Sequence, residues 1–302
     1  MKLALVGIGK IAQDQHVPSL AASPDWELAA TCSRAGEVAG VPSYRDFDAL
    51  LVEREDIKVI SLCLPPVPRF DYARRAIEAG RHVMLEKPPG ATLSECHALE
   101  DMACEAGVSI YATWHSREAG KVAAAKSWLA GQKITRAHIT WREDVRRWHP
   151  GQDWVFDPGG MGVFDPGINA LSILTEILPS PVHLKSARLE VPANRQGPIG
   201  ADLTFTDNVT ADLDWRQEGP QSWDIEVETA RGLLKLSDGG DTMTLDGVEA
   251  GVASEGGEYP RLYANMARLV GASKSEMDLA PLRHVADAFM LGERVIVDPF
   301  EF

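Results

Sequence analysis

The sequence predicts an α/β protein in two parts, a doubly wound parallel domain followed by an α+β domain with a mostly antiparallel open sheet. Three observations predict this fold class. Residues 1–118 alternate short apolar runs with helical patterns. A glycine-rich turn directly follows the first apolar run. Residues 182–245 are successive strand-like segments separated by Gly and Asp turns. We therefore expect one domain over 1–118 and a second over 119–302.

The first part contains five apolar runs that we expect to form parallel strands. They are short, nearly unbroken in apolar character and rich in Val and Ile, as strands covered by helices on both faces are. Helical patterns lie between them, and one of these patterns ends at Gly80, which suits a left-handed cap. The expected strands are 3–8, 28–32, 59–64, 82–86 and 109–113, and the expected helices are 11–23, 47–52, 69–79 and 93–106.

The second part has a different sequence pattern from the first. Helical patterns and an alternating stretch over 134–143 precede a loop rich in Trp, Arg and Asp. Short connections and alternating polarity then favour an antiparallel sheet. The expected strands are 184–191, 201–205, 209–215, 222–229, 233–236 and 242–245, and the expected helices are 121–130, 166–178, 259–269 and 281–290.

Composition excludes several functional classes. Thirty Lys and Arg against 44 Asp and Glu leave a net charge of −14, a field that repels nucleic acid. No apolar run approaches the roughly 20 residues of a membrane span. The first apolar run lacks a small-residue cleavage site, and the four cysteines form no C-x-x-C pair. We expect a cytoplasmic protein that binds a small molecule and needs no metal.

The turn Gly7-Ile8-Gly9-Lys10-Ile11-Ala12 is typical of a dinucleotide-binding Rossmann domain. Its first glycine permits the tight turn, and its second lets the backbone approach a pyrophosphate. The small third residue permits close packing of the helix on the strand. The alternative is a glycine turn that binds no ligand. The turn predicts cofactor contacts from Gly7, Gly9, Lys10 and Ile11.

The end of the second strand indicates which dinucleotide binds. NAD-dependent enzymes usually have Asp or Glu there, whereas this strand ends in Ser33-Arg34. Ser33 removes a carboxylate that would repel a 2′-phosphate, and Arg34 offers a guanidinium that can pair with it. We predict that NADP is preferred and NAD tolerated. The alternative for Arg34 is a solvated charge at a strand end.

Two further motifs carry a resemblance. Glu86-Lys87-Pro88 follows the fourth strand, and Asp165-Pro166-Gly167-Ile168-Asn169 begins a later helix. Together with the glycine turn they resemble the glucose–fructose oxidoreductase/inositol dehydrogenase (Gfo/Idh/MocA) family along the whole chain. Segments 141–152 and 162–171 look most like its aldose 1-dehydrogenases. The resemblance implies oxidation of D-galactose, L-arabinose and D-fucose at C1 to lactones, and cofactor contacts from Leu64, Pro65, Glu86 and Lys87.

The resemblance also implies catalytic residues. The family usually has histidine where this chain has Asn169, and an amide cannot titrate. Asp165 is then the first candidate for the general base, with Lys87 hydrogen-bonding the C1 oxygen and Asn169 orienting the sugar. Lys87 as the base is the rival assignment. A plain helix start, with Asp165 as N-cap, is the structural alternative.

Aromatic and polar residues suit a sugar pocket, because indole faces stack on a pyranose and carboxylates bond its hydroxyls. For Trp154 and Trp223, core packing is an equal alternative. Packing is favoured for Trp141, and packing or capping for His16. The resemblance assigns to the pocket His115, Glu143, Trp148, His149, Trp154, Asp165, Asn169 and Trp223.

Other functions stay open at this point. A sugar-responsive regulator that binds NADP without turnover has the same fold, as do family enzymes that act on another polyol or sugar. A lactone reductase would use the same residues in the opposite direction. The second domain, with one sheet face left uncovered by helices, predicts a homodimer through that sheet.

Overall fold

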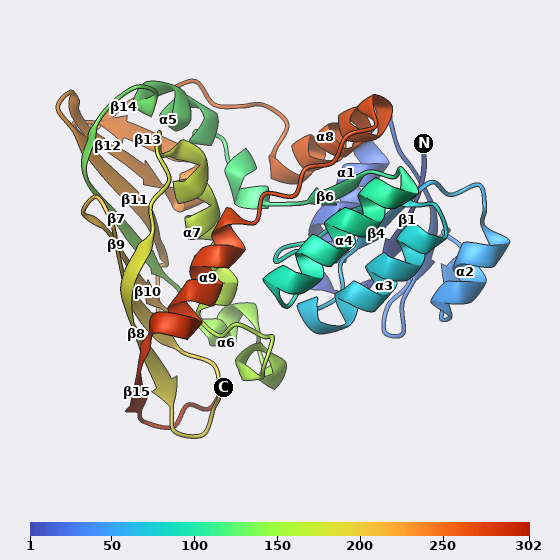
Figure 1. Ribbon diagram of the computed structural model, residues 1–302, viewed down its shortest axis with the longest axis horizontal. Helices are drawn as coiled ribbons and strands as arrows, with labels where there is room; N and C mark the ends of the chain where they lie inside the picture. Colours follow the sequence, from blue (N-terminus) through green and yellow to red (C-terminus); the bar gives the residue numbers. More distant parts are fainter. The chain divides into compact units, whose positions relative to one another are not determined.

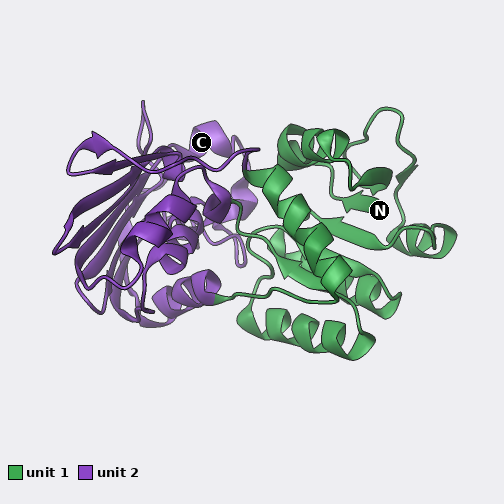
Figure 2. Cartoon of the chain, turned by 90° about the horizontal axis from the view of Figure 1, so that it is seen from above, with its two compact units in different colours: residues 1–115, 258–279 green, residues 116–257, 280–302 purple.

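The computed structural model describes residues 1–302 and contains two compact units (Figure 2). Unit 1 comprises Met1–His115 and Glu258–Leu279, and unit 2 comprises Ser116–Gly257 and Ala280–Phe302. The first division lies three residues before the predicted boundary. The second domain is not continuous to residue 302, however, because Glu258–Leu279 return to unit 1. The cause is helix α8 (Glu258–Ala272), whose apolar face is buried in the core of unit 1.

Unit 1 contains a six-stranded sheet in the order β3-β2-β1-β4-β5-β6 (Figure 1). All of its strand pairs are parallel. The doubly wound fold is therefore confirmed, and only the two-residue strand β3 was not predicted. The strands are β1 (Lys2–Val6), β2 (Glu27–Cys32), β3 (Ser43–Tyr44), β4 (Val59–Leu62), β5 (His82–Leu85) and β6 (Ile110–Ala112).

Helices cover both faces of this sheet. One face packs against Phe47, Ala73 and Leu99 of α2, α3 and α4, and the other against residues of α1 and α8. The helix predicted over 11–23 is an α-helix only in its second half, since its first turns widen into the π-helix η1 (Ala12–His16). The α-helices are α1 (Val17–Ala22), α2 (Phe47–Glu53), α3 (Pro66–Glu78) and α4 (Leu93–Ala106).

Unit 2 contains a nine-stranded sheet in the order β14-β13-β12-β11-β7-β10-β9-β8-β15. The sheet is mostly antiparallel, as predicted, but β7 with β10 and β8 with β15 are parallel pairs. Strands β14 and β15 were not predicted. The strands are β7 (Ile134–Arg142), β8 (Leu184–Pro192), β9 (Gly200–Phe205), β10 (Val209–Asp214), β11 (Ser222–Thr229), β12 (Gly232–Ser237), β13 (Thr242–Leu245), β14 (Val248–Glu249) and β15 (Glu293–Val297).

Three main helices cover one face of this sheet: α5 (Val122–Leu129), α7 (Phe164–Ile177) and α9 (Ala280–Leu291). Alternate strand residues such as Ile139, Leu213 and Ile225 are buried beneath them. The short helices α6 (Val145–Trp148) and η3 (Asp153–Phe156) follow β7, η2 (His115–Glu118) precedes α5, and η4 (Asp238–Gly240) follows β12. None of the helices has the length and apolar character needed to cross a bilayer.

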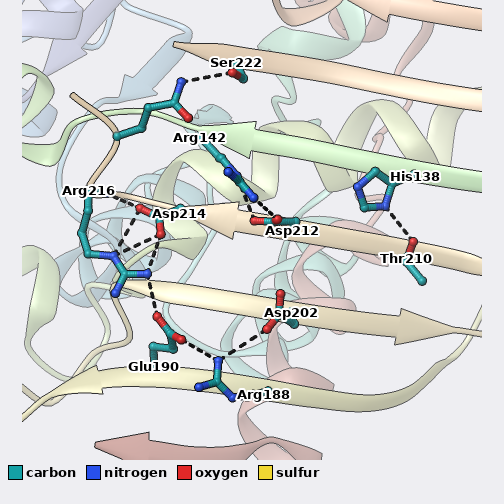
Figure 3. Close-up of polar contacts among 11 residues, drawn as sticks. His138, Arg142, Arg188, Glu190, Asp202, Thr210, Asp212, Asp214, Arg216 and Ser222 are labelled. Atoms are coloured by element: carbon teal, nitrogen blue, oxygen red, sulfur yellow. Dashed lines mark hydrogen bonds and ion pairs between the residues drawn. The ribbon is translucent and has the colours of Figure 1, made fainter. Parts of the chain in front are cut away.

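The opposite face of the sheet of unit 2 carries charged side chains that pair along it (Figure 3). Arg216 Nη2 lies 2.6 Å from Glu190 Oε2, and Arg188 Nη1 lies 2.5 Å from Glu190 Oε1. Arg142 pairs with Asp212 on the neighbouring strand. This uncovered face is polar and presents paired charges, so the homodimer expected through it stays a prediction.

Candidate active site

The turn between β1 and η1 has the shape that a dinucleotide requires. Gly7 has φ +89°, and a Cβ there would lie 3.1 Å from the backbone nitrogen of Leu64. A Cβ on Gly9 would meet nothing within 4 Å, so open space lies beside that backbone. No side chain caps the helix start that follows. Uncapped N–H groups beside open space fit a pyrophosphate, as the sequence predicts.

Ser33 shapes the loop that follows β2. Its Oγ accepts hydrogen bonds from the N–H groups of Ile8, Ala35 and Gly36 at 3.3, 3.2 and 3.2 Å. Arg34 is exposed and makes no hydrogen bond or ion pair. The end of β2 therefore presents an available guanidinium and no carboxylate.

The other predicted cofactor residues lie on the same sheet edge or on the helix start. Lys10 and Ile11 are exposed, and the Lys10 ammonium pairs with Asp14. Leu64 and Pro65 follow β4, directly before α3. Their place at the carboxyl ends of parallel strands is where ligands bind in such sheets.

Glu86 lies at the end of β5 and is only 5% exposed. Its Oε1 accepts a hydrogen bond from the Tyr259 hydroxyl at 2.7 Å and lies 3.3 Å from His16 Nε2. Its Oε2 accepts from the backbone N–H of Lys87 at 2.6 Å. His16 Nδ1 in turn lies 2.7 Å from the Tyr263 hydroxyl. The carboxylate thus holds the backbone of the predicted catalytic lysine.

Electrostatic interactions keep the Glu86 carboxylate charged although it is buried. Burial alone would raise the pKa of Glu86, but the hydrogen bond and the charge of His16 outweigh burial and hold that pKa well below its usual range. Burial alone would lower the pKa of His16, but Cys63, Tyr263 and Glu86 raise it well above its usual value. Burial and the Glu86 charge raise the pKa of Tyr259. His16 and Glu86 therefore form a buried ion pair, whereas the sequence analysis expected packing or capping for His16.

Arg69 of α3 is a buried arginine that the sequence analysis did not single out. Its guanidinium donates to the carbonyl oxygens of Leu64, Glu86 and Pro88. These carbonyls belong to the loops after β4 and β5, the first of which carries two predicted cofactor residues. Lys87 is half-buried, and its peptide bond to Pro88 is cis. One side chain thus ties together two loops of the cofactor edge.

In unit 2, Asp165 and His149 form a pair. Helix α7 begins at Phe164 with Val163 as its N-cap residue, so Asp165 lies inside the first turn. The alternative that Asp165 is the N-cap is therefore wrong. Its Oδ2 lies 3.0 Å from His149 Nε2, with side chains 13% and 22% exposed respectively. The two predicted site residues meet although 16 positions separate them in the chain.

Glu143 lies at the end of β7 and is 5% exposed. Its Oε1 accepts from Trp215 Nε1 at 3.1 Å, and its Oε2 accepts from Trp223 Nε1 at 2.9 Å. The Trp148 and Trp223 rings lie 5.8 Å apart, and Trp148 Nε1 is buried without a partner. Trp141 stacks on Trp223 at 5.7 Å, which agrees with packing. Trp215 was missed because it looked like the end of a strand.

The remaining predicted residues are less closely associated. Trp154 is 36% exposed, and its ring centroid lies 6.2 Å from that of His149. Asn169 follows Asp165 by one helical turn, and its carbonyl accepts from Ser172. His115 belongs to unit 1, where Nδ1 lies 2.9 Å from Glu258 and the ring stacks on Tyr259. No group of three or more His, Cys, Asp or Glu side chains is placed to hold a metal ion.

Comparison with known proteins agrees with the Rossmann fold of unit 1. Residues 1–113 match the model of an oxidoreductase family with an NAD-binding Rossmann fold. The chain is 40% identical to galactose 1-dehydrogenase from Pseudomonas fluorescens over an alignment of 316 positions. That alignment covers 99% of this chain and 98% of the relative.

Solved structures extend the comparison. D-galactose-1-dehydrogenase from Rhizobium etli superposes with a TM-score of 0.94 at 53% identity, covering 99% of this chain and 97% of that one. KijD10, a 3-ketoreductase from Actinomadura kijaniata solved with NADP and TDP-benzene, superposes with a TM-score of 0.83. It covers 98% of this chain and 99% of its own at 19% identity, so it shows a shared fold.

Proposed function

This chain belongs to the oxidoreductase family with the NAD-binding Rossmann fold, and we propose that it is an NAD(P)-dependent aldose 1-dehydrogenase. Its proposed substrates are D-galactose, L-arabinose and D-fucose, oxidised at C1 to lactones. The observation that carries the proposal is the His149–Asp165 pair in unit 2. The same unit holds Glu143, whose carboxylate accepts hydrogen bonds from the indoles of Trp215 and Trp223. An acid–base pair supports proton transfer, and indole faces support sugar stacking. Relatives named for galactose oxidation support the substrate class.

The proposed chemistry removes a hydride from C1 and a proton from the C1 hydroxyl. A bound nicotinamide dinucleotide supplies the hydride acceptor. Asp165 accepts the proton, and His149 holds one oxygen of its carboxylate while the other faces the sugar hydroxyl. The Asn169 amide orients the sugar. The Lys87 ammonium donates a hydrogen bond to the C1 oxygen and stabilises its developing negative charge. Lys87 as the base remains the rival assignment.

We propose that NADP is the preferred cofactor and that NAD is tolerated. Support comes from the end of β2, where the Ser33 hydroxyl accepts three backbone N–H groups and no carboxylate is present to repel a 2′-phosphate. Arg34 is exposed and unpaired, so its guanidinium is available for that phosphate. A cytoplasmic location and a homodimer through the sheet of unit 2 stay predictions.

The test is the initial rate of absorbance increase at the NADPH band. The panel is D-galactose, L-arabinose, D-fucose, D-glucose, D-xylose and myo-inositol, each with NADP and with NAD. We expect turnover with the first three sugars, faster with NADP. Turnover with another member of the panel would move the proposal to that sugar or polyol.

No turnover of any panel member, with NADP still bound, would favour the second candidate, a sugar-responsive regulator that binds NADP without turnover. Sugar binding measured by calorimetry would then distinguish a regulator from a protein whose ligand lies outside the panel. A faster reverse reaction, with NADPH and a lactone, would indicate a reductase.

A further inference from the structure

The edge of the sheet in unit 1 carries a second arginine that the sequence analysis did not use. Strands β2 and β3 are parallel, and Cys32 is paired with Tyr44. The backbone N–H of Ser33 donates to the Tyr44 carbonyl at 3.0 Å. Arg45 follows directly after β3, so its backbone lies beside Ser33 at the carboxyl edge of the sheet. Ligands bind at that edge in doubly wound folds.

The register of β2 and β3 places Arg45 and Ser33 next to each other, directly beyond the paired ends of the two strands. Cys32 is part of the core on one side of the sheet, and Tyr44 packs against that core. Ser33 and Arg45 therefore each follow directly after a residue that contacts this core. The arginine next to Ser33 in the chain is Arg34. Two arginines, Arg34 and Arg45, thus follow the ends of adjacent strands.

Neither guanidinium is neutralised. Arg34 and Arg45 are exposed and have no hydrogen bond or ion pair. The carboxylates nearest to Arg45 in the chain are already engaged: Asp46 accepts the N–H groups that begin α2, and Asp48 pairs with Arg75. Two exposed arginines without an acidic partner at this edge favour the binding of an anion there, although the chain as a whole has a net charge of −14.

We propose that Arg45 determines cofactor specificity together with Arg34, the two forming a clamp for the 2′-phosphate of NADP. The inference rests on the NADP preference proposed above and adds a residue to it. A 2′-phosphate carries up to two negative charges and three acceptor oxygens, enough for two guanidinium groups. NAD has a hydroxyl there, so neither arginine gains a charged partner from it.

The experiment measures binding with no sugar present. Isothermal titration calorimetry gives dissociation constants of NADP, NAD, adenosine 2′,5′-bisphosphate and 5′-AMP for the wild type, Arg34→Ala, Arg45→Ala and the double variant. We expect each single variant to weaken NADP and the bisphosphate about tenfold, the double variant about a hundredfold, and NAD and 5′-AMP to change less than twofold. Arg45→Lys should recover part of the loss, because it keeps the charge but not the planar fork.

The matched control is Arg283→Ala, which removes an exposed arginine without a partner from α9 in unit 2. Loss of NADP affinity in Arg45→Ala no larger than in this control would overturn the inference, as would an equal loss for NAD. The sugar panel is read separately. Sugar turnover by the wild type, together with unchanged NADP affinity in Arg45→Ala, would remove only the clamp. The expected changes in affinity without any sugar turnover would remove only the dehydrogenase proposal.

Discussion

His16–Glu86 in unit 1 and His149–Asp165 in unit 2 are both histidine–carboxylate pairs, and the two differ in their surroundings. His16 and Glu86 in unit 1 lie 3.3 Å apart with side chains 1% and 5% exposed. His149 and Asp165 in unit 2 lie 3.0 Å apart and are 22% and 13% exposed. The first pair is bonded further to Tyr259 and Tyr263. His16–Glu86 is thus a sealed pair, buried away from solvent, whereas His149–Asp165 is partly exposed to solvent.

The difference in burial indicates that the two pairs have different roles. A buried ion pair whose partners are all protein groups holds geometry, and here it holds the backbone of Lys87. A partly exposed pair retains access for a substrate and for proton exchange. Burial, more than residue type, therefore separates the positioning pair from the pair that we propose to act on the sugar. The predictions below test this distinction, from the largest expected effect to the smallest.

Asp165→Asn should cause the largest loss. Removing the proposed proton acceptor is expected to lower kcat about 1000-fold, which corresponds to roughly 4 kcal/mol of transition-state stabilisation. Steady-state kinetics with the preferred sugar measures the loss, and calorimetry checks that NADP still binds. The matched control is Asp157→Asn, an exposed aspartate in the same segment. A kcat within tenfold of wild type would transfer the role of base to Lys87.

Glu86→Gln should act on stability. It leaves His16 without its charged partner in a buried site, and we expect the free energy of unfolding to fall by about 3 kcal/mol. Chemical denaturation measures the change, and Glu53→Gln on the exposed end of α2 is the control. A fall no larger than that of the control would show that the sealed pair does not stabilise unit 1.

The same pair predicts how stability depends on pH. The pKa of Glu86 is lowered in the fold, so its contribution is present above its ordinary value of 4.5 and is lost as pH falls below it. The pKa of His16 is raised, so its contribution is complete below 6.5 and is lost as pH rises through the raised pKa. The difference in Tm between wild type and Glu86→Gln should therefore be largest between about pH 4.5 and 6.5. A difference that is constant from pH 4 to 9 would argue against an ion pair.

His149→Asn should separate the two pairs most directly. Because His149 holds Asp165 in a partly exposed site, we expect kcat to fall about 30-fold while Tm changes by less than about 2 °C. His16→Asn, the matched variant in the sealed pair, should lower Tm more. Kinetics and thermal melts on both variants measure the contrast. A larger fall in Tm for His149→Asn than for His16→Asn would contradict this assignment of roles.

Trp223→Phe should have a smaller effect on the sugar. It leaves Glu143 Oε2 without its indole donor while preserving a ring for stacking. We expect KM for the sugar to rise about tenfold with kcat little changed, as measured by steady-state kinetics. Trp128→Phe, the same substitution on α5, is the control. Equal KM values for the two variants would place Trp223 in packing alone.

Arg216→Gln on the uncovered face of the sheet should have the smallest effect. Its pairs with Glu190 and Asp214 are partly exposed, and such pairs contribute about 1 kcal/mol or less. Denaturation measures the stability, and sedimentation measures the mass. We predict twice the mass of the chain for the wild type. A monomeric mass would remove the predicted homodimer, and a dimer that Arg216→Gln dissociates would place the interface on this face.

Local patterns in the sequence predicted much of the fold. The helix α4 and the strands β11 and β13 begin and end at the predicted residues, because apolar periodicity, a capping box and turn residues act over a few positions. The glycine turn and the Ser33-Arg34 end of β2 were located in the same way. Strand ends of a parallel sheet meet at one edge, so sequence order alone indicates which loops carry ligand contacts.

The sequence by itself determined the fold class, the glycine turn and most of the residue types of the candidate site. Only the tertiary structure decided their partners: His16 for Glu86, Trp215 for Glu143 and Arg45 beside Ser33. It also returned α8 to unit 1, which brings Tyr259 to Glu86. The physical reason is that these contacts depend on strand order and on which faces are buried, and neither is encoded in the spacing of neighbouring residues.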